Sequence, residues 1–481
     1  MSKGFIGRAT ELAVLAKRLV RVSQSGSGAA ITIKGRRQVG KSRLVQEFCN
    51  QSKVPYLFFT ATKGASSVNA VSDFYLGLRE STLATDRELV PDTASTWPDA
   101  FRVLASVLPE TPSIVVLDEV PWLSEQDEIF DGALQTAWDR LLSEHPVLLL
   151  LLGSDIHMME RFTSYDRPFF GRADNLSLGP LTLAESAQAT GLTNSDAIDA
   201  HLITGGLPGI LRSWPRGTPA LSFLEAECAD PAAALFNVPE ATLMAEFPAP
   251  DQARRVLEAV GAGERTHANI AASAGNQHGS LPSCSLSPLL HRLVEEKRVL
   301  SIDQPLSTQT GKPPLYRVAD SNLRFYLAAG RAAQELVQRG RPQSAFQIIQ
   351  RRWSSWRGKA VEPLIRESLE LAALAGTLPW PKVERVGSWW NRQFNPELDL
   401  VGADRAPIAQ HISFVGSIKW LASPFDHRDL ANLFRDATGV PGFVPGETAH
   451  IVVSLSGVSP QVDLTKVDLH WGAKEIVAAW R

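Results

Sequence analysis

Short apolar runs alternate with amphipathic stretches over the first third of the chain. Four of these runs are rich in β-branched or aromatic residues, as buried strands are. They read AAITIKG at 29–35, VPYLFFTAT at 54–62, SIVVLDEVPWL at 113–123 and VLLLLLGSD at 147–155. RLVQEFCNQS at 43–52 follows the first run and has helical spacing. Such an alternation predicts an α/β domain built on a parallel sheet.

The pattern changes to helices in the middle of the chain. Residues 251–262, 266–275 and 280–300 have helical periodicity, and the last of these ranges ends in a strand-like segment. A proline-rich stretch and PLYRVAD at 314–320 follow, which suggests a hairpin. Three helices followed by a hairpin predict a winged-helix domain, whose third helix is the one that enters a major groove in DNA-binding members.

A second α/β pattern occupies the C-terminal part. VEPLIRESLELA at 361–372 is a helix candidate, and the segments 389–404 and 406–420 each contain a strand candidate. Because side chains alternate along a strand, Glu397 and Asp399 lie on one face of theirs. Ser417 and Lys419 share a face of the next strand for the same reason.

Length and composition fit a chain of several folded domains. The 481 residues correspond to about three domains. A hydrophobic content of 44% and a net charge of −3 argue against an overall basic coat for nucleic acid. Cys49, Cys228 and Cys284 are far apart, so we expect neither a disulfide framework nor a zinc site. With no signal-like apolar segment and no run long enough to span a bilayer, a cytoplasmic chain without membrane contact is expected.

The strongest chemical signal is GRRQVGKS at 35–42, which matches the phosphate-binding loop pattern GxxxxGK[ST] between a strand and a helix. Gly35 and Gly40 let the backbone N–H groups curl around phosphate oxygens. Lys41 supplies a cation for the β and γ phosphates, and Ser42 supplies a hydroxyl to Mg²⁺. The pattern predicts ATP and Mg²⁺ as ligands. The expected nucleotide-binding residues of this segment are Gly35, Arg36, Arg37, Gln38, Val39, Gly40, Lys41, Ser42 and Arg43.

A second signal supports the first. The apolar run at 113–118 ends in Asp118 and Glu119, the pattern of the metal-holding strand in phosphate-loop ATPases. Asp118 is the candidate for the Mg²⁺ shell, and Glu119 is placed to polarise the water that attacks the γ phosphate. An extra strand between these two motifs is typical of the additional-strand branch of these ATPases. At the tip of the next strand, Ser154 or the adjacent Asp155 is the candidate sensor of the γ phosphate.

Together these segments resemble the archaeal ATPase family of AAA+/STAND phosphate-loop ATPases, whose members carry a winged helix and a C-terminal DUF234-like, nuclease-like domain. FIGRATEL at 5–12, FFGRADNLSLGPL at 169–181 and TGGLP at 204–208 match its other landmarks. The resemblance implies a homo-oligomer. Arg172 would be an arginine finger or a sensor, in its own or a neighbouring subunit, with Arg161 and Arg167 close by in the sequence. The resemblance also implies nucleotide contacts from Phe5, Gly7, Arg8 and Pro208.

DNA and a protein remain alternative partners. Positions 280–289 of the third winged-helix segment contain no arginine or lysine, so phosphate contacts have to come from elsewhere. The stretch 331–359 is the better electrostatic candidate, because it has one acid, Glu335, and interleaves Trp353 and Trp356 with basic residues. A solvated helix face is its other interpretation. The basic residues are Arg331, Arg339, Arg341, Arg351, Arg352, Arg357 and Lys359.

The C-terminal pattern resembles the PD-(D/E)XK nuclease core, with one departure. Members of that family have a glutamate where this chain has Ser417, and a hydroxyl supplies neither the charge nor the basicity of a metal-binding carboxylate. Glu362 or Glu397 is the candidate substitute. The resemblance therefore implies a nuclease-like fold that has lost cleavage. The remnant site comprises Glu362, Glu397, Asp399, Ser417 and Lys419.

The expected organisation is a phosphate-loop ATPase domain with a helical extension at 1–240, a winged helix at 245–330, a basic linker helix at 331–359 and a nuclease-like domain at 360–481. The expected function is an ATPase that couples Mg-ATP hydrolysis to a conformational or oligomeric change, acting on or with DNA. One alternative is a nucleotide-dependent switch that binds a protein partner. A weaker alternative is an ATP-gated, metal-dependent DNA nuclease.

Overall fold

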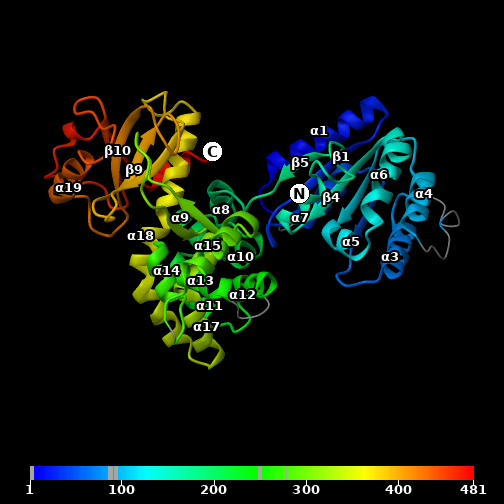
Figure 1. Ribbon diagram of the computed structural model, residues 1–481, viewed down its shortest axis with the longest axis horizontal. Helices are drawn as coiled ribbons and strands as arrows, with labels where there is room; N and C mark the ends of the chain where they lie inside the picture. The colour runs from blue at the N-terminus through cyan, green and yellow to red at the C-terminus, as the bar shows by residue number, and fades with distance from the viewer. Residues whose placement is uncertain (1–4, 85–89, 91–95, 248–251, 278) are drawn as a thin grey trace. The chain divides into compact units, whose positions relative to one another are not determined.

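A five-stranded parallel sheet forms the centre of the N-terminal unit, Met1–Leu181, one of two compact units into which the computed structural model divides (Figure 1). The structure describes residues 5–84, 90, 96–247, 252–277 and 279–481. The strand order is β2-β3-β4-β1-β5. These strands are β1 (Ala29–Lys34), β2 (Tyr56–Thr60), β3 (Ser113–Asp118), β4 (Val147–Gly153) and β5 (Asp174–Ser177).

Helices bury both faces of this sheet. Alternate residues such as Val115 and Leu117 of β3 join an apolar cluster with α3–α6, whereas Ile114 and Val116 are buried on the opposite face. The helix α1 packs against α2 and β4. Fully buried parallel strands read as continuous apolar runs, which is why periodicity predicted them well. The helices are α1 (Ala9–Ser25), α2 (Lys41–Ser52), α3 (Ser67–Glu80), α4 (Trp97–Val107), α5 (Val120–Gln126), α6 (Phe130–Arg140) and α7 (Ile156–Phe162).

The second unit, Thr182–Arg481, begins with helices. The first five are α8 (Leu183–Thr190), α9 (Asn194–Thr204), α10 (Pro208–Ser213), α11 (Ala220–Cys228) and α12 (Ala234–Glu246). The expected winged-helix order follows, with three helices and an antiparallel hairpin. Residue 251, where its first helix was expected to begin, lies outside the described residues. These elements are α13 (Gln252–Gly261), α14 (His267–Ser273), α15 (Ser283–His291), β6 (Leu300–Asp303) and β7 (Leu315–Val318).

A mixed sheet and one long helix complete the second unit. After α16 (Ser321–Phe325) and α17 (Arg331–Gln338), α18 runs without a break from Pro342 to Leu374. The expected boundary at 359/360 therefore falls inside one helix of 33 residues. The sheet has the order β12-β11-β10-β9-β8, with β8, β9 and β10 antiparallel and the remainder parallel. Its elements are β8 (Arg385–Trp390), β9 (Glu397–Ala403), β10 (Ile412–Lys419), α19 (His427–Ala437), β11 (Ala449–Ser454), β12 (Leu469–Trp471) and α20 (Ala473–Ala478).

The expected fold class is confirmed. The strand that separates β1 from β3 in the sheet is β4, whereas β2, the strand candidate between the two motifs in the sequence, is at the sheet edge beside β3. The C-terminal part has its own separate mixed sheet. The two compact units meet in sequence at 181/182, whereas the sequence placed its first boundary at 240. The division into four domains stays a proposal. Among the helices of the described residues, none combines the length and the apolar character needed to cross a membrane.

Candidate functional site

The candidate phosphate loop joins the end of β1 to the start of α2. A Cβ atom on Gly35 would lie 2.3 Å from the Leu178 carbonyl oxygen, so only glycine permits this approach of the two backbones. Gly40, the residue before α2, has φ 92°, and Gln38 has φ 66°. These left-handed conformations turn the chain into the helix at Lys41. The loop therefore delivers its backbone N–H groups and the N-terminus of α2 to one place.

Lys41 lies inside this loop with its ammonium group near backbone oxygens. Its Nζ donates to the carbonyl oxygens of Gly35 at 2.8 Å and Arg36 at 3.1 Å. Burial lowers the pKa of Lys41 to about 8, although the carboxylates of Asp118 and Glu119 act in the opposite direction. A buried ammonium held by neutral carbonyls is poised to exchange them for an anion.

Ser42 and Asp118 meet at the carboxyl end of the sheet. Ser42 Oγ donates to Asp118 Oδ2 at 2.6 Å, and the N–H group of Glu119 donates to Asp118 Oδ1 at 3.0 Å. Burial raises the pKa of Asp118, and the Ser42 hydrogen bond opposes that shift. A hydroxyl and a carboxylate oxygen in contact form the hard-oxygen pair that suits Mg²⁺, so these two residues fit the metal expected from the sequence.

Glu119 and Ser154 are brought together from adjacent strands. Glu119 follows β3 with φ 59°, a left-handed conformation that directs its side chain toward the end of β4. Its Oε2 accepts hydrogen bonds from Ser154 Oγ at 2.8 Å and Ser154 N at 3.2 Å. The neighbouring candidate, Asp155, instead caps α7 by accepting from the N–H of Met158 at 3.0 Å. Of the two sensor candidates, Ser154 is therefore the one in contact with Glu119.

Arg8 ties the opening segment to the loop. Its Nη2 donates to the carbonyl oxygens of Val39 at 2.9 Å and Gly179 at 2.6 Å, and its Nη1 pairs with Glu11 at 3.0 Å. The side chain is 4% exposed. These bonds tie the opening segment to the loop through Val39. The nucleotide contacts expected of Phe5, Gly7 and Arg8 stay predictions. The motif at 5–12 did not predict the hydrogen bond from Arg8 to the carbonyl oxygen of Val39.

Arg172, the candidate arginine finger, has partners of its own. Arg172 donates twice to Asp139 of α6, at 2.7 Å each, and Nη1 also bonds the carbonyls of Pro168 and Phe170. Within its own unit, the partners found for its guanidinium are therefore on α6 and in the residues just before Arg172. Pro208 begins α10 of the second unit. The roles expected for Arg172 and Pro208 stay predictions.

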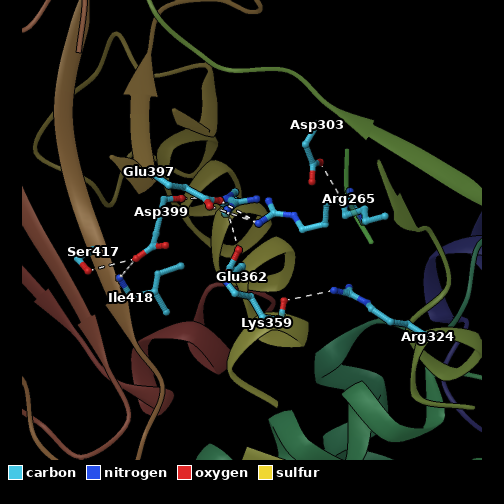
Figure 2. A network of polar contacts seen from close by, with 11 residues as sticks. Arg265, Asp303, Arg324, Lys359, Glu362, Glu397, Asp399, Ser417 and Ile418 are labelled. Carbon is cyan, nitrogen blue, oxygen red and sulfur yellow. Dashed lines mark hydrogen bonds and ion pairs between the residues drawn. The ribbon is translucent and has the colours of Figure 1, made fainter. Parts of the chain in front are cut away.

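Four of the five nuclease-like candidates lie in one network of polar contacts (Figure 2), namely Glu362, Glu397, Asp399 and Ser417. Asp399 Oδ2 accepts from Ser417 Oγ at 3.2 Å and from the N–H of Ile418 at 2.8 Å. Burial raises the pKa of Asp399 to about 6, and the nearby charge of Glu362 acts in the same direction. Asp399 and Ser417 are therefore in contact, and their role as a remnant metal site stays a prediction.

The other two carboxylates of this cluster form ion pairs with basic side chains. Glu362 pairs with Arg366 at 3.1 Å and Lys359 at 3.2 Å, and Glu397 pairs with Arg265 at 3.1 Å. Sequence reasoning missed Arg265 and Arg366 because neither belongs to a motif. In the described part of the chain, no group of three or more His, Cys, Asp or Glu side chains has the geometry to hold a metal ion.

Lys419 pairs with a residue outside the expected remnant site. Its Nζ bonds Asp429 Oδ2 of α19 at 2.5 Å. Asp429 also closes the N-terminus of α19, where its Oδ2 accepts from the N–H of Asp426 at 3.0 Å. The contact that the structure gives this lysine is therefore structural. Asp429 had no motif signal in the sequence.

The basic stretch 331–359 is divided between α17 and α18 and is partly neutralised. Arg331 pairs with Glu258, Arg357 pairs with Asp199 at 2.6 Å, and Lys359 pairs with Glu362. Asp199 is 5% exposed, so the Arg357 pair is buried. The stretch is therefore not one continuous face of free cations. Its exposed members are Arg339, Arg341, Arg351, Arg352 and Lys359, of which Lys359 is in an ion pair.

Residues 330–429 match the family model DUF234, described as archaeal and bacterial proteins of unknown function. This match confirms the DUF234-like region expected from the resemblance, and it contains all five nuclease-like candidates. Among curated proteins, the uncharacterized protein MJECL04 of Methanocaldococcus jannaschii is 24% identical over 440 residues, which is 90% of each chain. The similarity thus extends over both units.

Two solved structures resemble the chain more weakly. The Walker-type ATPase PABY2304 of Pyrococcus abyssi is 18% identical, covers 68% of this chain and 97% of its own, and gives a TM-score of 0.46. The ORC2 protein of Aeropyrum pernix, solved with ADPNP and ADP, is 14% identical, covers 72% and 96%, and gives 0.43. At these scores, the function has to be argued from the residues of this chain.

Proposed function

We propose that the N-terminal unit binds and hydrolyses Mg-ATP and that hydrolysis drives a conformational or oligomeric change in a protein that acts with double-stranded DNA. The observation that carries the ATPase proposal is the convergence of Lys41, the Ser42–Asp118 pair and the Ser154–Glu119 pair at one end of the sheet. Each group has the chemistry that phosphoryl transfer to water requires.

Binding follows from the geometry of the loop. Backbone N–H groups of residues 35–42 and the N-terminus of α2 favour the negative charge of phosphates, and Lys41 adds a cation. Ser42 and Asp118 would hold Mg²⁺, which neutralises phosphate charge when bound. Arg8 keeps the loop in place through Val39. The chain thus orients the polyphosphate before any reaction.

Glu119 is the group that handles the attacking water. An ionised carboxylate accepts a hydrogen bond from water and increases its nucleophilicity. The two hydrogen bonds from Ser154 restrict where Glu119 Oε2 can lie, so Ser154 acts as a positioning residue. If the Ser154 hydroxyl turns to a phosphate, the backbone N–H of Ser154 still holds Glu119 Oε2.

The proposed DNA contact is with the phosphate backbone. The exposed Arg339 and Arg341 supply cations for this contact, whereas α15 carries neither arginine nor lysine between Ser283 and His291. Contacts of this kind position a duplex without reading its sequence. A homo-oligomer, with Arg172 reaching a neighbouring nucleotide, belongs to the same proposal.

The deciding experiment measures phosphate release by the purified protein with Mg²⁺ and ATP, with and without double-stranded DNA, using Lys41→Ala as the blank. We expect turnover that Lys41→Ala removes and that DNA increases in low salt, with the increase lost as salt rises. Equal phosphate release by the wild-type protein and by Lys41→Ala would overturn the ATPase proposal. Turnover indifferent to DNA would overturn only the choice of partner.

A protein partner is the second candidate, and a specific observation favours it. The third helix of the winged-helix segment lacks cations, and three of the seven basic residues of 331–359 are already in ion pairs. Both features weaken attraction to DNA and suit a docking domain. A partner captured with ATP but not with ADP would distinguish this switch from the DNA-dependent ATPase.

A further inference from the structure

A pocket of about 500 Å³ lies in the second unit, between the winged-helix segment and α18. Its walls come from the end of α13, the hairpin β6–β7, the turn after α16 and one face of α18. This volume is in the range of sites that hold a small organic ligand. No residue of the phosphate loop at 35–42 contributes to it.

The pocket is strongly basic. Seven arginine or lysine side chains line it against two acids, Asp303 and Glu362. Four of these cations pair with three carboxylates, in the pairs Arg265–Glu397, Arg317–Asp303, Lys359–Glu362 and Arg366–Glu362. The other three are Arg324, Arg351 and Arg352.

These three arginines donate to backbone carbonyls instead. Arg324 Nη1 bonds the oxygen of Lys359 at 3.2 Å, Arg351 Nε bonds that of Gln347 at 3.3 Å, and Arg352 bonds that of Ala328. Among the described residues, none of the three forms an ion pair with a carboxylate. A neutral carbonyl does not compensate a guanidinium charge, so the pocket keeps an excess of positive charge. An anion would compensate it.

Two buried donors point to the same conclusion. Arg324 Nε and Trp356 Nε1 are both buried and have no hydrogen-bond partner in the described structure. Trp356 is 8% exposed and lines the pocket together with Arg324. Buried donors are nearly always satisfied in folded proteins, by the chain itself, by water or by a ligand. Burial and the nearby Arg317 charge also lower the pKa of Arg324 to about 10, and the charges of Glu362 and Asp303 oppose that shift.

Figure 2 shows how several of these groups face one another. Arg265 approaches from the winged-helix side, Lys359 and Glu362 come from α18, and Arg324 extends toward the carbonyl of Lys359. Beyond these charges the wall is apolar, with Val318, Tyr316 and Trp356. A concave site with cations and an aromatic, apolar wall fits a ligand that joins phosphate groups to a flat ring.

We propose that this pocket is a second ligand site, separate from the phosphate loop, for a free small molecule of nucleotide size that carries adjacent phosphate groups. Arg324, Arg351 and Arg352 bind the phosphates, and the apolar wall takes the remainder of the molecule. The guanidinium fork suits phosphate oxygens because it donates two parallel hydrogen bonds. The proposal goes beyond ATP hydrolysis, since it requires no reaction in the pocket.

Equilibrium dialysis tests this site with a slowly hydrolysed ATP analogue and with inorganic tripolyphosphate, each on the full-length chain. We expect Lys41→Ala to retain binding of both probes in the pocket. In that background, Arg351→Ala with Arg352→Ala should weaken binding about tenfold or more, since two charge-assisted contacts are lost. Arg324→Ala should have a similar effect.

The matched control is Arg428→Ala with Arg435→Ala, which removes the same charge from exposed positions of α19 and should leave binding unchanged. Two outcomes would overturn the proposal. One is that the Lys41→Ala protein binds neither probe while circular dichroism shows it folded. The other is that short duplex DNA, and neither small probe, depends on Arg351 and Arg352, which would assign the arginines to a DNA backbone. Phosphate release by the wild-type protein tests the ATPase separately.

Discussion

Ser154 donates two hydrogen bonds to a single oxygen of Glu119, from Oγ at 2.8 Å and from its backbone N–H at 3.2 Å. The two residues are at the ends of neighbouring strands and 35 positions apart in sequence. We predict that Ser154→Ala lowers the rate of phosphate release by about 10- to 100-fold while ATP affinity changes little, because a positioning contact is lost and the phosphate contacts remain. Single-turnover kinetics measures both quantities. Ser106→Ala, on the surface of α4, is the control, and equal rates in the two variants would contradict the positioning role.

Lys41 predicts a pH dependence of nucleotide binding. Its pKa is lowered to about 8, so the free protein loses the ammonium charge as the pH rises through that value. Phosphate oxygens favour the charged form, so binding should weaken above about pH 8 and take up about one proton per nucleotide. Calorimetry in buffers of different ionisation enthalpy measures this uptake. Lys41→Arg keeps its charge and should show no uptake; the same uptake in both proteins would assign the proton to another group.

Arg172 is held by Asp139, and the two residues predict opposite effects. Arg172→Ala should abolish turnover and spare ATP binding, as expected of a group that acts only on the transition state. Asp139→Asn removes one carboxylate from its guanidinium, so the side chain becomes freer to reach a nucleotide and turnover should persist. Phosphate release at several protein concentrations measures both, and mixing the Arg172→Ala and Lys41→Ala proteins tests action between subunits. Wild-type turnover in Arg172→Ala would rule out the finger.

Asp399 predicts that stability depends on pH. Its pKa rises from the ordinary 3.8 to about 6 in the folded chain, so the folded state binds the proton more tightly than the unfolded state. Stability from this group is present at low pH and is lost as the pH rises toward about 6. Asp399→Asn avoids that loss. We expect it to raise the free energy of unfolding, relative to wild type, by about 1–3 kcal/mol more at about pH 7.5 than at about pH 4.5. Urea unfolding at both values measures the difference; an equal effect at both would contradict the buried charge.

Ser417→Glu tests whether one missing ligand explains the departure from the nuclease pattern. The new carboxylate would lie beside Asp399, whose oxygen is 3.2 Å from Ser417 Oγ. We expect the free energy of unfolding of this variant in EDTA to be about 1–2 kcal/mol below that of the wild type, because two like charges share a buried site. Mn²⁺ should restore this stability. Thermal unfolding with and without metal measures this. A variant that is equally stable in EDTA and Mn²⁺ and inert on DNA would show that the ion pairs of Glu362 and Glu397, rather than Ser417, exclude the metal.

Local patterns predicted the site of the first unit better than they predicted its surroundings. Four fully apolar runs and a loop with fixed glycine and lysine positions are signals contained in a few residues. The position of β4 between β1 and β3 is different, because strand order depends on pairing between segments far apart in sequence. The Ser154–Glu119 contact follows from that order. From the sequence, Ser154 could be named only as a candidate at the tip of a strand, and its contact with Glu119 could not be predicted.

The basic stretch illustrates the opposite limit. Its charge was visible in the sequence, and its partners were not, because Glu258 and Asp199 are distant in sequence from the arginines that they pair with. The contacts of Arg265 with Glu397 and of Arg324 with the carbonyl of Lys359 could not be predicted for the same reason, because the partners are far apart in sequence. A charge run can be counted in a sequence. Whether it is neutralised depends on the tertiary structure.

The uninterrupted helix α18 has a consequence for how this protein can be divided. At 1.5 Å per residue, its 33 residues extend about 50 Å. Near its middle, Arg357 is anchored to Asp199 of α9, and nine residues later Arg366 donates to the carbonyl oxygen of Asp399 in β9. A cut anywhere between these anchors would expose apolar core on both fragments. We therefore expect the DUF234 region to be inherited together with the helices before it, as one indivisible piece, and recombination with other proteins to occur ahead of residue 182 instead.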